Sequence, residues 1–277
     1  MTTVIIRNAR RMPINFRLIY VITLLLFSGC ASIRHALPVG MSAVATVDGM
    51  DDVRATSGYP SAFMVKDFTG LIATEETKNP FIFKADKTYS FLAISGGGGN
   101  GAYGAGILNG WSKAGDRPEF KVVTGISTGA IIAPFAFLGS EYDDKLKDFY
   151  TKYSTKDLLR KKAFFSALFS DSLTSNAPLE RLIDKNFDAA LLKRIAEEYE
   201  KGRRLYVGTT NLDEQKLIIW DMGKIASRRD EESLRLFRKI ILASSAIPVA
   251  FPPVYFDVQA GNKKYDEMHV DGGITKQ

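Results

Sequence analysis

A serine flanked by glycines is the feature of this chain whose residue types and spacing point most directly to chemistry. The pattern Gly-x-Ser-x-Gly spans Gly125–Gly129 and centres on Ser127. The β-rich run Lys121–Thr124 precedes it and the apolar run Ala130–Ala133 follows, so we expect a strand that turns sharply into a helix. The two outer glycines remove side chains that would clash at such a turn. The turn would present the Ser127 hydroxyl near a helix N-terminus, where a nucleophile is well placed.

A glycine-rich loop lies ahead of the serine, between a predicted strand over 89–94 and a predicted helix over 102–113. Its residues are Gly96, Gly97, Gly98, Gly99, Asn100 and Gly101. Backbone N–H groups of such a loop can hold either a phosphate or the oxyanion of an acyl-transfer intermediate. The loop also fits a dinucleotide-binding pattern, with Glu119 near the spacing of a ribose-binding acid. The serine motif that follows favours an oxyanion hole, and a purely structural tight turn is the remaining alternative.

A serine nucleophile needs a base, and the chain offers two histidines and one well-placed aspartate for that role. His35 lies far toward the N-terminus, whereas His269 stands two residues before Asp271, on the same face if both lie on a strand. His269 could therefore approach the serine, although a histidine that only packs within the strand is the favoured interpretation. Asp271 opens the run Asp271–Gly273 and is the better candidate base, since a desolvated cleft can raise a carboxyl pKa. On its own, Asp-Gly-Gly would indicate only a turn.

Taken together, these motifs resemble those of the patatin-like phospholipase family. That family shows a glycine-rich oxyanion loop, a Gly-x-Ser-x-Gly nucleophile and an Asp-Gly-Gly or Asp-Gly-Ala motif, in this order. The segments Ala243–Pro248 and Phe251–Val254 are also similar to a stretch found shortly before the family's aspartate. The resemblance covers residues 88–277. One departure is Asn100, where many members carry Arg or Lys.

The resemblance implies a role for each motif. It makes Ser127 the nucleophile and Asp271 the general base of a Ser-Asp dyad that hydrolyses acyl esters of lipids. The implied oxyanion hole consists of the backbone amides of Gly97, Gly98 and Gly99. The remaining glycines that shape the three motifs are Gly96, Gly101, Gly125, Gly129, Gly272 and Gly273. No cofactor and no metal is implied, and the expected substrate is a phospholipid or another acyl-ester lipid.

The predicted fold is an α/β fold of the three-layer α/β/α patatin-like type, with a mainly parallel central sheet. Further strands are predicted over 122–124, 205–210 and 216–220, and helices over 177–183, 191–200 and 234–243. A strand–helix–strand order at 89–124 indicates a parallel sheet with helices on its faces. The chain stops four residues after Gly273, so we expect a C-terminal part of the domain, 88–277, to be missing.

The N-terminus predicts export. Residues 1–29 combine a basic region with an apolar run over 18–27 that is too short to span a bilayer, as in a signal peptide. The only cysteine, Cys30, ends the run Phe27–Cys30, which resembles a bacterial lipobox. We therefore expect lipidation at Cys30 and a tether with an irregular segment over 30–87; a plain signal peptide or membrane anchor is the alternative. Neither Ala31 nor Ser32 is an aspartate, which favours the outer membrane of a Gram-negative cell envelope.

Composition separates the remaining function classes. The net charge is +6, with 25% charged and 45% hydrophobic residues, which is ordinary for a globular protein. The basic residues are scattered, which favours a solvated surface over a nucleic-acid partner. The leading hypothesis is a membrane-tethered serine lipid acyl hydrolase. The alternatives are a catalytically inactive envelope lipoprotein that binds lipid, and a protein that binds a nucleotide at the glycine loop. The sequence does not indicate an oligomeric state.

Overall fold

A computed structural model describes residues 34–47, 49–61, 64–65, 88–152 and 175–275. The chain divides into a unit of residues 1–34 and a compact unit of residues 35–277, and everything below concerns the second. The predicted signal peptide and Cys30 lie outside the described residues. None of the helices in the described ranges is long and apolar enough to span a lipid bilayer.

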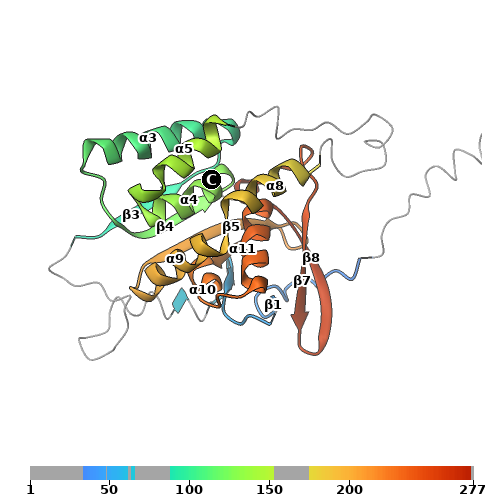
Figure 1. The fold of residues 1–277 in the computed structure, drawn as a ribbon. Helices are drawn as coiled ribbons and strands as arrows, with labels where there is room; N and C mark the ends of the chain where they lie inside the picture. The colour runs from blue at the N-terminus through green and yellow to red at the C-terminus, as the bar shows by residue number, and fades with distance from the viewer. Residues whose placement is uncertain (1–33, 48, 62–63, 66–87, 153–174, 276–277) are drawn as a thin grey trace, which may run out of the picture. The chain divides into compact units, whose positions relative to one another are not determined.

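The compact unit is a curled sheet packed against helices (Figure 1). The strands are β1 (Thr46–Val47), β2 (Arg54–Thr56), β3 (Ser90–Ile94), β4 (Phe120–Ile126), β5 (Arg204–Asn211), β6 (Lys216–Asp221), β7 (Val254–Ala260) and β8 (Lys263–Asp271). The α-helices are α3 (Gly101–Ala114), α4 (Thr128–Leu138), α5 (Asp143–Thr151), α8 (Ala177–Asn186), α9 (Ala189–Glu200), α10 (Met222–Ala226) and α11 (Glu231–Ser244). The described residues also contain three short 3-10 turns: η1 (Gly98–Asn100), η2 (Ser140–Tyr142) and η3 (Gly272–Ile274). The predicted α/β class is confirmed.

The prediction of a mainly parallel sheet is wrong. Strands run in the order β1-β7-β8-β5-β4-β3, with β6 pairing both β5 and β2. Among the strands of the described residues, only β3–β4 and β4–β5 are parallel, and the other pairs are antiparallel. The reason is the length of the connections, because β5–β6 and β7–β8 are joined by short turns that permit only antiparallel pairing. The turn between β7 and β8 is Gly261-Asn262, a dipeptide typical of hairpins.

Strand β5 is the centre of the sheet and organises its two halves. One of its edges pairs with β6, from Tyr206 to Asn211. Its other edge pairs first with β4, up to the pair of Ile126 with Gly208. The same edge then pairs with β8, beginning with Thr209 opposite Asp271. The end of β4 and the end of β8 therefore meet at adjacent positions on one edge of β5.

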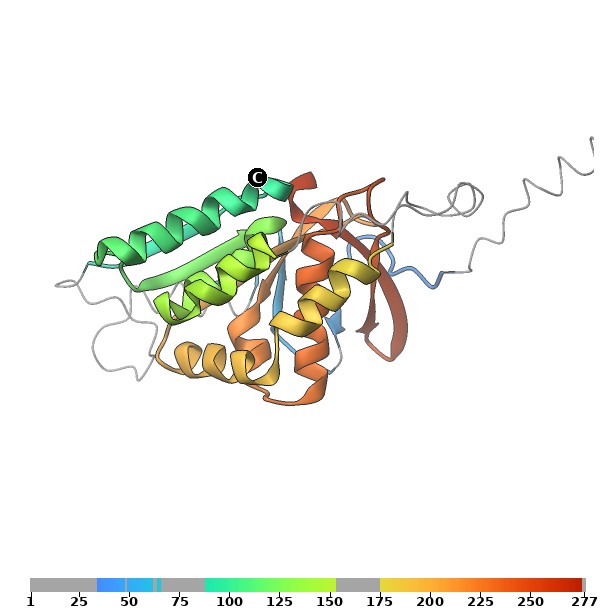
Figure 2. The same cartoon turned by 45° about the horizontal axis from the view of Figure 1, so that its top comes forward.

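Helix α4 is the core helix of the fold. Every one of its residues is buried, and it packs on β4 and β5, with α3, α5 and α9 around it. Figures 1 and 2 show α3 and α5 together over the part of the sheet that holds β3 and β4, and α11 over β5. The opposite face carries a smaller cluster in which Ala55 and Tyr206 contact Met64, Val122 and Ile219. The described residues place no long helix on that face.

The segment before residue 88, expected to be a tether and irregular chain, contributes two strands to the domain. Strand β1 pairs with β7 and strand β2 pairs with β6. Leu37 donates its backbone N–H to the carbonyl oxygen of Asp266, at 3.0 Å. The Ser42 hydroxyl donates to Glu214 at 2.8 Å. The compact unit defined by its internal contacts begins at His35.

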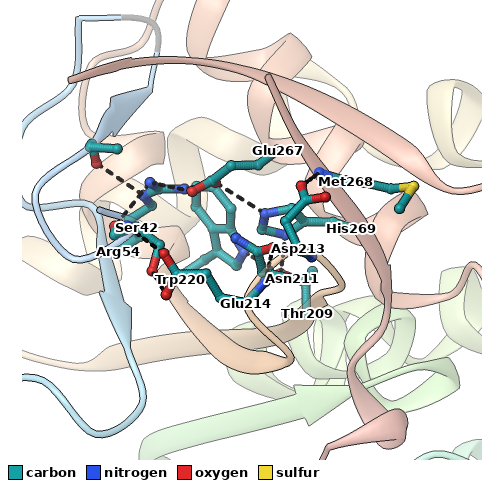
Figure 3. A network of polar contacts seen from close by, with 11 residues as sticks. Ser42, Arg54, Thr209, Asn211, Asp213, Glu214, Trp220, Glu267, Met268 and His269 are labelled. Carbon is teal, nitrogen blue, oxygen red and sulfur yellow. Dashed lines mark hydrogen bonds and ion pairs between the residues drawn. The ribbon is translucent and has the colours of Figure 1, made fainter. Parts of the chain in front are cut away.

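A buried ion pair fastens this segment to β8 (Figure 3). The Arg54 guanidinium contacts the carboxylate of Glu267, and both side chains are almost wholly buried. Glu267 also contacts His269 Nε2 at 3.2 Å, and His269 Nδ1 lies 2.9 Å from the Thr209 hydroxyl. Burial alone would raise the pKa of Glu267, but the hydrogen bond from His269 and the charge of Arg54 lower it to about 2. Burial also lowers the pKa of His269, which keeps its ring neutral.

We expect Glu267→Gln to lower the free energy of unfolding at pH 7 by about 3 kcal/mol, because it leaves the Arg54 charge buried without its partner. In the wild type, the depressed pKa of Glu267 means that its stabilisation is present above the unfolded-state pKa of about 4.3 and is lost as pH falls toward 2. The variant should show a shallower loss of stability in that window. Urea unfolding between pH 7 and pH 3 measures both effects. Glu232→Gln, which removes one of the exposed carboxylates that pair with Arg228, should change stability by less than about 0.5 kcal/mol.

Candidate active site

Ser127 sits at the sharp junction between β4 and α4. Strand β4 ends at Ile126 and α4 begins at Thr128, so one residue makes the whole turn. Its backbone has φ 58° and ψ −128°, a region that a residue with a side chain occupies only at a cost of about 1–3 kcal/mol. This strand–turn–helix geometry is that of a nucleophile elbow.

The two glycines of the motif are required by space. A Cβ at Gly125 would lie 2.3 Å from the carbonyl oxygen of Gly129. A Cβ at Gly129 would lie 2.2 Å from the carbonyl oxygen of Ile94, at the end of β3. Because both contacts are with backbone atoms, no side-chain rearrangement could relieve them. The elbow is therefore packed between its own helix and the neighbouring strand.

The glycine loop runs beside the serine. A Cβ at Gly96 would lie 3.0 Å from the Cβ of Ser127, so the loop backbone approaches the serine side chain closely. Gly97 and Gly98 have φ of 159° and 54°, and Gly98 and Gly99 begin η1. Gly101 then starts α3. The loop thus lies where its backbone N–H groups could face an oxygen bound to Ser127.

Asp271 lies where β8 ends, next to the end of β4 on the same edge of β5. It is the last residue of β8 and is 4% exposed. Its Oδ1 accepts the N–H of Gly273 at 2.8 Å, which also caps η3. Its Oδ2 is buried and has no partner that meets hydrogen-bond geometry among the described residues. A Cβ at Gly272 would lie 2.4 Å from the carbonyl oxygen of Gly208, so this turn too needs its glycine.

The environment of Asp271 makes it a better proton acceptor. Burial raises the pKa of Asp271, while its interactions with the Ser127 hydroxyl and with the Gly273 amide oppose that rise. Because Oδ2 makes no full hydrogen bond, the contact between Asp271 and the Ser127 hydroxyl is a loose one. The pair can therefore work as hydroxyl donor and carboxylate acceptor.

Residues at the end of α11 form hydrogen bonds with the backbones of both Ser127 and Asp271. The sequence motifs did not predict a role for these residues at the site. The Ser127 N–H donates to the Ser244 hydroxyl at 3.0 Å, and that hydroxyl donates to the Gly208 carbonyl oxygen at 2.7 Å. The Ser245 hydroxyl donates to the Ser127 carbonyl oxygen at 3.3 Å. The carbonyl oxygen of Ala246 accepts the Asp271 N–H at 2.9 Å. The signals that could have revealed this were the Ser244-Ser245 pair at a helix end and an isolated glycine, Gly208, within a strand.

Two other candidate residues lie elsewhere. His269 is fully buried and its ring nitrogens contact Glu267 and Thr209 rather than Ser127 (Figure 3). An ionised Glu267 can only accept, so Nε2 of the neutral ring carries the proton and Nδ1 accepts from Thr209. Glu119, the possible ribose-binding acid, precedes β4 and lies 3.9 Å from Arg203. That is the end of the strand opposite to the glycine loop, which argues against dinucleotide binding.

A cavity of about 650 Å³ lies at the C-terminal end of α4, away from the serine. Three arginines line it, Arg117, Arg194 and Arg203, and each is already paired with a carboxylate of the protein. Arg117 and Arg203 also donate to the carbonyl oxygens of Ala136 and Phe137, which caps the helix. Arg117 and Arg203 therefore stabilise the end of α4 that is opposite to Ser127.

Fold and site together define a class: an α/β protein with a serine elbow, a glycine loop and a buried aspartate. The patatin-like phospholipase model matches residues 92–276, and the chain belongs to that family. Among solved structures the chain is similar to VipD from Legionella pneumophila, with 17% identity and a TM-score of 0.44. That match covers 69% of this chain and 47% of VipD, so the chain spans about half of that protein's length. A comparison with curated proteins finds no significant match.

We expect Gly125→Ala to destabilise the protein by at least about 2 kcal/mol and to slow labelling of Ser127 by a fluorophosphonate, because the new Cβ meets the Gly129 carbonyl oxygen. Gly106→Ala is the matched control, since Gly106 lies within α3 and a Cβ there meets nothing within 4 Å. That variant should gain about 0.5–1 kcal/mol and label at the wild-type rate. Thermal melts and labelling time courses test both, and equal behaviour of the two variants would contradict the packing argument.

Proposed function

We propose that this protein is a serine lipid acyl hydrolase of the phospholipase A or lipase type, acting through a Ser127–Asp271 dyad. Membership of the patatin-like phospholipase family supports lipid acyl hydrolysis in general. The observation that carries the dyad is the meeting of two strand ends on one edge of β5. There, the strained Ser127 elbow and the buried Asp271 carboxyl lie at adjacent positions of the sheet.

In the proposed acylation step, Ser127 Oγ attacks the ester carbonyl carbon of the lipid. Asp271 accepts the hydroxyl proton through Oδ2, the oxygen that is buried and without a full hydrogen bond. The tetrahedral intermediate then collapses, the C–O bond to the alcohol breaks, and the proton passes from Asp271 to the departing alkoxide. The products of this step are an acyl-enzyme and a free alcohol or lysolipid.

The negative oxygen of the intermediate needs backbone donors. The Ser127 N–H is already committed to Ser244. The Thr128 N–H belongs to the first residue of α4 and has no acceptor within the helix. We assign the oxyanion hole to the Thr128 amide and to the amides of Gly97, Gly98 and Gly99, with the N-terminal end of α4 adding positive potential. In deacylation, water attacks the acyl carbonyl while Asp271 takes its proton. The bond between the acyl carbon and Ser127 Oγ then breaks, the proton passes from Asp271 to Ser127 Oγ, and the fatty acid leaves.

The alternative is a catalytically inactive lipoprotein that binds lipid in the cell envelope. Neither the strain at Ser127 nor the unpaired, buried Asp271 oxygen is needed for binding alone, and both carry a cost in stability. These two features favour the enzyme. Failure of a fluorophosphonate to label the folded protein would instead favour the lipid-binding alternative.

Ser127→Ala and Asp271→Asn should each lower hydrolysis of p-nitrophenyl butyrate at least about 10³-fold, because each removes one half of the acylation chemistry. Circular dichroism should show an unchanged fold in both variants. Lysolipid and fatty-acid release from mixed phospholipid vesicles, followed by mass spectrometry, would then identify the lipid class and acyl position. Substantial hydrolysis of the ester by the Ser127→Ala variant would contradict the proposed function.

Asp271→Asn should also raise the melting temperature at neutral pH. The pKa of Asp271 is raised in the folded protein, so folding favours its protonated form and the ionised carboxylate costs stability above that pKa. An asparagine has no charge to bury and can still accept the Gly273 N–H. The same shift predicts that wild-type kcat/KM declines in acid at a pH above the ordinary aspartate pKa, as the base becomes protonated. A stability loss in Asp271→Asn would contradict this account of its environment.

We also propose that the chain is a lipoprotein of the bacterial envelope, held at a membrane through lipidated Cys30. The support is the sequence alone: the basic and apolar leader and the position of the single cysteine directly after it. When the full chain is expressed in a Gram-negative host, wild type should incorporate radiolabelled palmitate and sediment with membranes. Cys30→Ala should do neither, while Ser32→Ala should behave as wild type. Palmitate incorporation into Cys30→Ala would exclude this site.

A further inference from the structure

We infer that Tyr150 is a positioning residue for the proposed reaction, because it joins the glycine loop to the serine elbow and sets the spacing between the two halves of the oxyanion hole. This inference rests on the proposed function. Tyr150 lies near the end of α5, a helix that contributes neither Ser127 nor the glycine loop. No sequence motif pointed to it.

The Tyr150 hydroxyl holds the first residue of α4 at two points. It lies 2.5 Å from the Thr128 hydroxyl and donates to the Thr128 carbonyl oxygen at 3.3 Å. When it donates to that carbonyl, the Thr128 hydroxyl is the donor in the other contact. Thr128 is 7% exposed and directly follows Ser127, so a shift of its peptide moves an oxyanion-hole amide.

The same two hydroxyls are pressed against the end of the glycine loop. A Cβ at Gly101 would lie 2.2 Å from the Thr128 hydroxyl oxygen and 2.6 Å from the Tyr150 hydroxyl oxygen. The space that a side chain would fill at Gly101 is thus occupied by this pair. Three segments far apart in sequence, the loop end, the elbow and α5, meet at one hydrogen bond.

This contact matters because the oxyanion hole has two parts on separate segments. The amides of Gly97–Gly99 belong to the loop, whereas the Thr128 amide belongs to α4. Both must point at one oxygen within hydrogen-bond distance, and preorganised donors are effective only when their spacing is fixed. Tyr150 sets that spacing through Gly101 on one side and Thr128 on the other.

Tyr150 does not exchange protons in this role. Burial raises the pKa of Tyr150 to about 12, although its hydrogen bond with Thr128 opposes the rise. The phenol therefore stays protonated across any practical assay range. Removing the Tyr150 hydroxyl should therefore lower activity by the same factor at every pH. The decline of kcat/KM in acid, which we assign to Asp271, should stay at the same pH. Loss of a second general acid or base would instead change the shape of the pH profile.

The test compares Tyr150→Phe with wild type in p-nitrophenyl butyrate hydrolysis. We expect kcat to fall about tenfold or more while KM stays within about twofold, because the change affects the transition state rather than substrate binding. Fluorophosphonate labelling should slow by a similar factor. Thr128→Val removes the same hydrogen bond from its other side, so the double variant should lose no more than the more damaged single variant.

Tyr142→Phe is the matched control. Tyr142 precedes α5, and its phenol interacts with Arg194 at the far end of α4. Its kcat should remain within about twofold of wild type. A Tyr150→Phe enzyme with wild-type kcat, an equal loss in Tyr142→Phe, or fully additive effects of Tyr150→Phe and Thr128→Val would each overturn the inference. Activity in Ser127→Ala contradicts the proposed function itself, whereas an active Tyr150→Phe in a serine-dependent enzyme contradicts only the role of Tyr150.

Discussion

The site depends on one constraint, the sharing of a single edge of β5 by two strands. Strand β4 pairs with this edge up to Gly208, and β8 pairs with it from Thr209 onward. Each strand must leave the sheet at that point, and each does so at a member of the proposed dyad, Ser127 after β4 and Asp271 at the end of β8. Because the sheet register fixes both departures, their relative position follows from backbone hydrogen bonds. The Ser244 hydroxyl adds the last link, since it contacts both the Ser127 amide and the Gly208 carbonyl oxygen.

The backbone strain at this junction is tolerated because the helix that follows it, α4, is held in the core of the protein. Ser127 has an unfavourable backbone conformation, and Asp271 buries an oxygen that lacks a full hydrogen bond. Helix α4 behind the serine is buried along its whole length, and Arg117 and Arg203 satisfy its last carbonyl groups. Removing the helix from its place would expose all of that apolar surface. A local cost of a few kcal/mol at the site is therefore offset by the core that holds it.

Local motifs and alternation were enough to predict the first parallel strands, the serine turn and most helices, because each depends on neighbours within a few residues. The mainly parallel sheet was the wrong prediction, although Gly261-Asn262 and the alternating burial of β7 indicate a hairpin. The braces at the site were harder to find. Ser244 and Tyr150 make their contacts with residues 117 and 22 positions away. The serine pair at the end of α11 was a weak local signal for the first contact, and no spacing rule indicates the second. Similarly, the role of Arg54 depends on the pairing of β2 with β6, after which its side chain contacts Glu267 on β8.

Two buried carboxylates on one face of β8 have opposite pKa shifts, which suits one to an ion pair that stabilises the fold and the other to the proposed role of a base. Glu267 and Asp271 are four residues apart and both are buried. Burial favours a raised pKa at both, but neighbouring groups reverse this effect at Glu267 and do not reverse it at Asp271. Arg54 and His269 lower the pKa of Glu267 to about 2, so this carboxylate stays charged and cannot serve as a base near neutral pH. At Asp271 burial raises the pKa, and within the described part of the chain this rise is opposed by the hydroxyl of Ser127 and the amide of Gly273, neither of which carries a charge. A cation placed next to Asp271 would stabilise the fold and at the same time weaken its hold on the serine proton. His269 lies between Glu267 and Asp271 in the sequence. Its ring is neutral and contacts Glu267, so it places no positive charge next to Asp271.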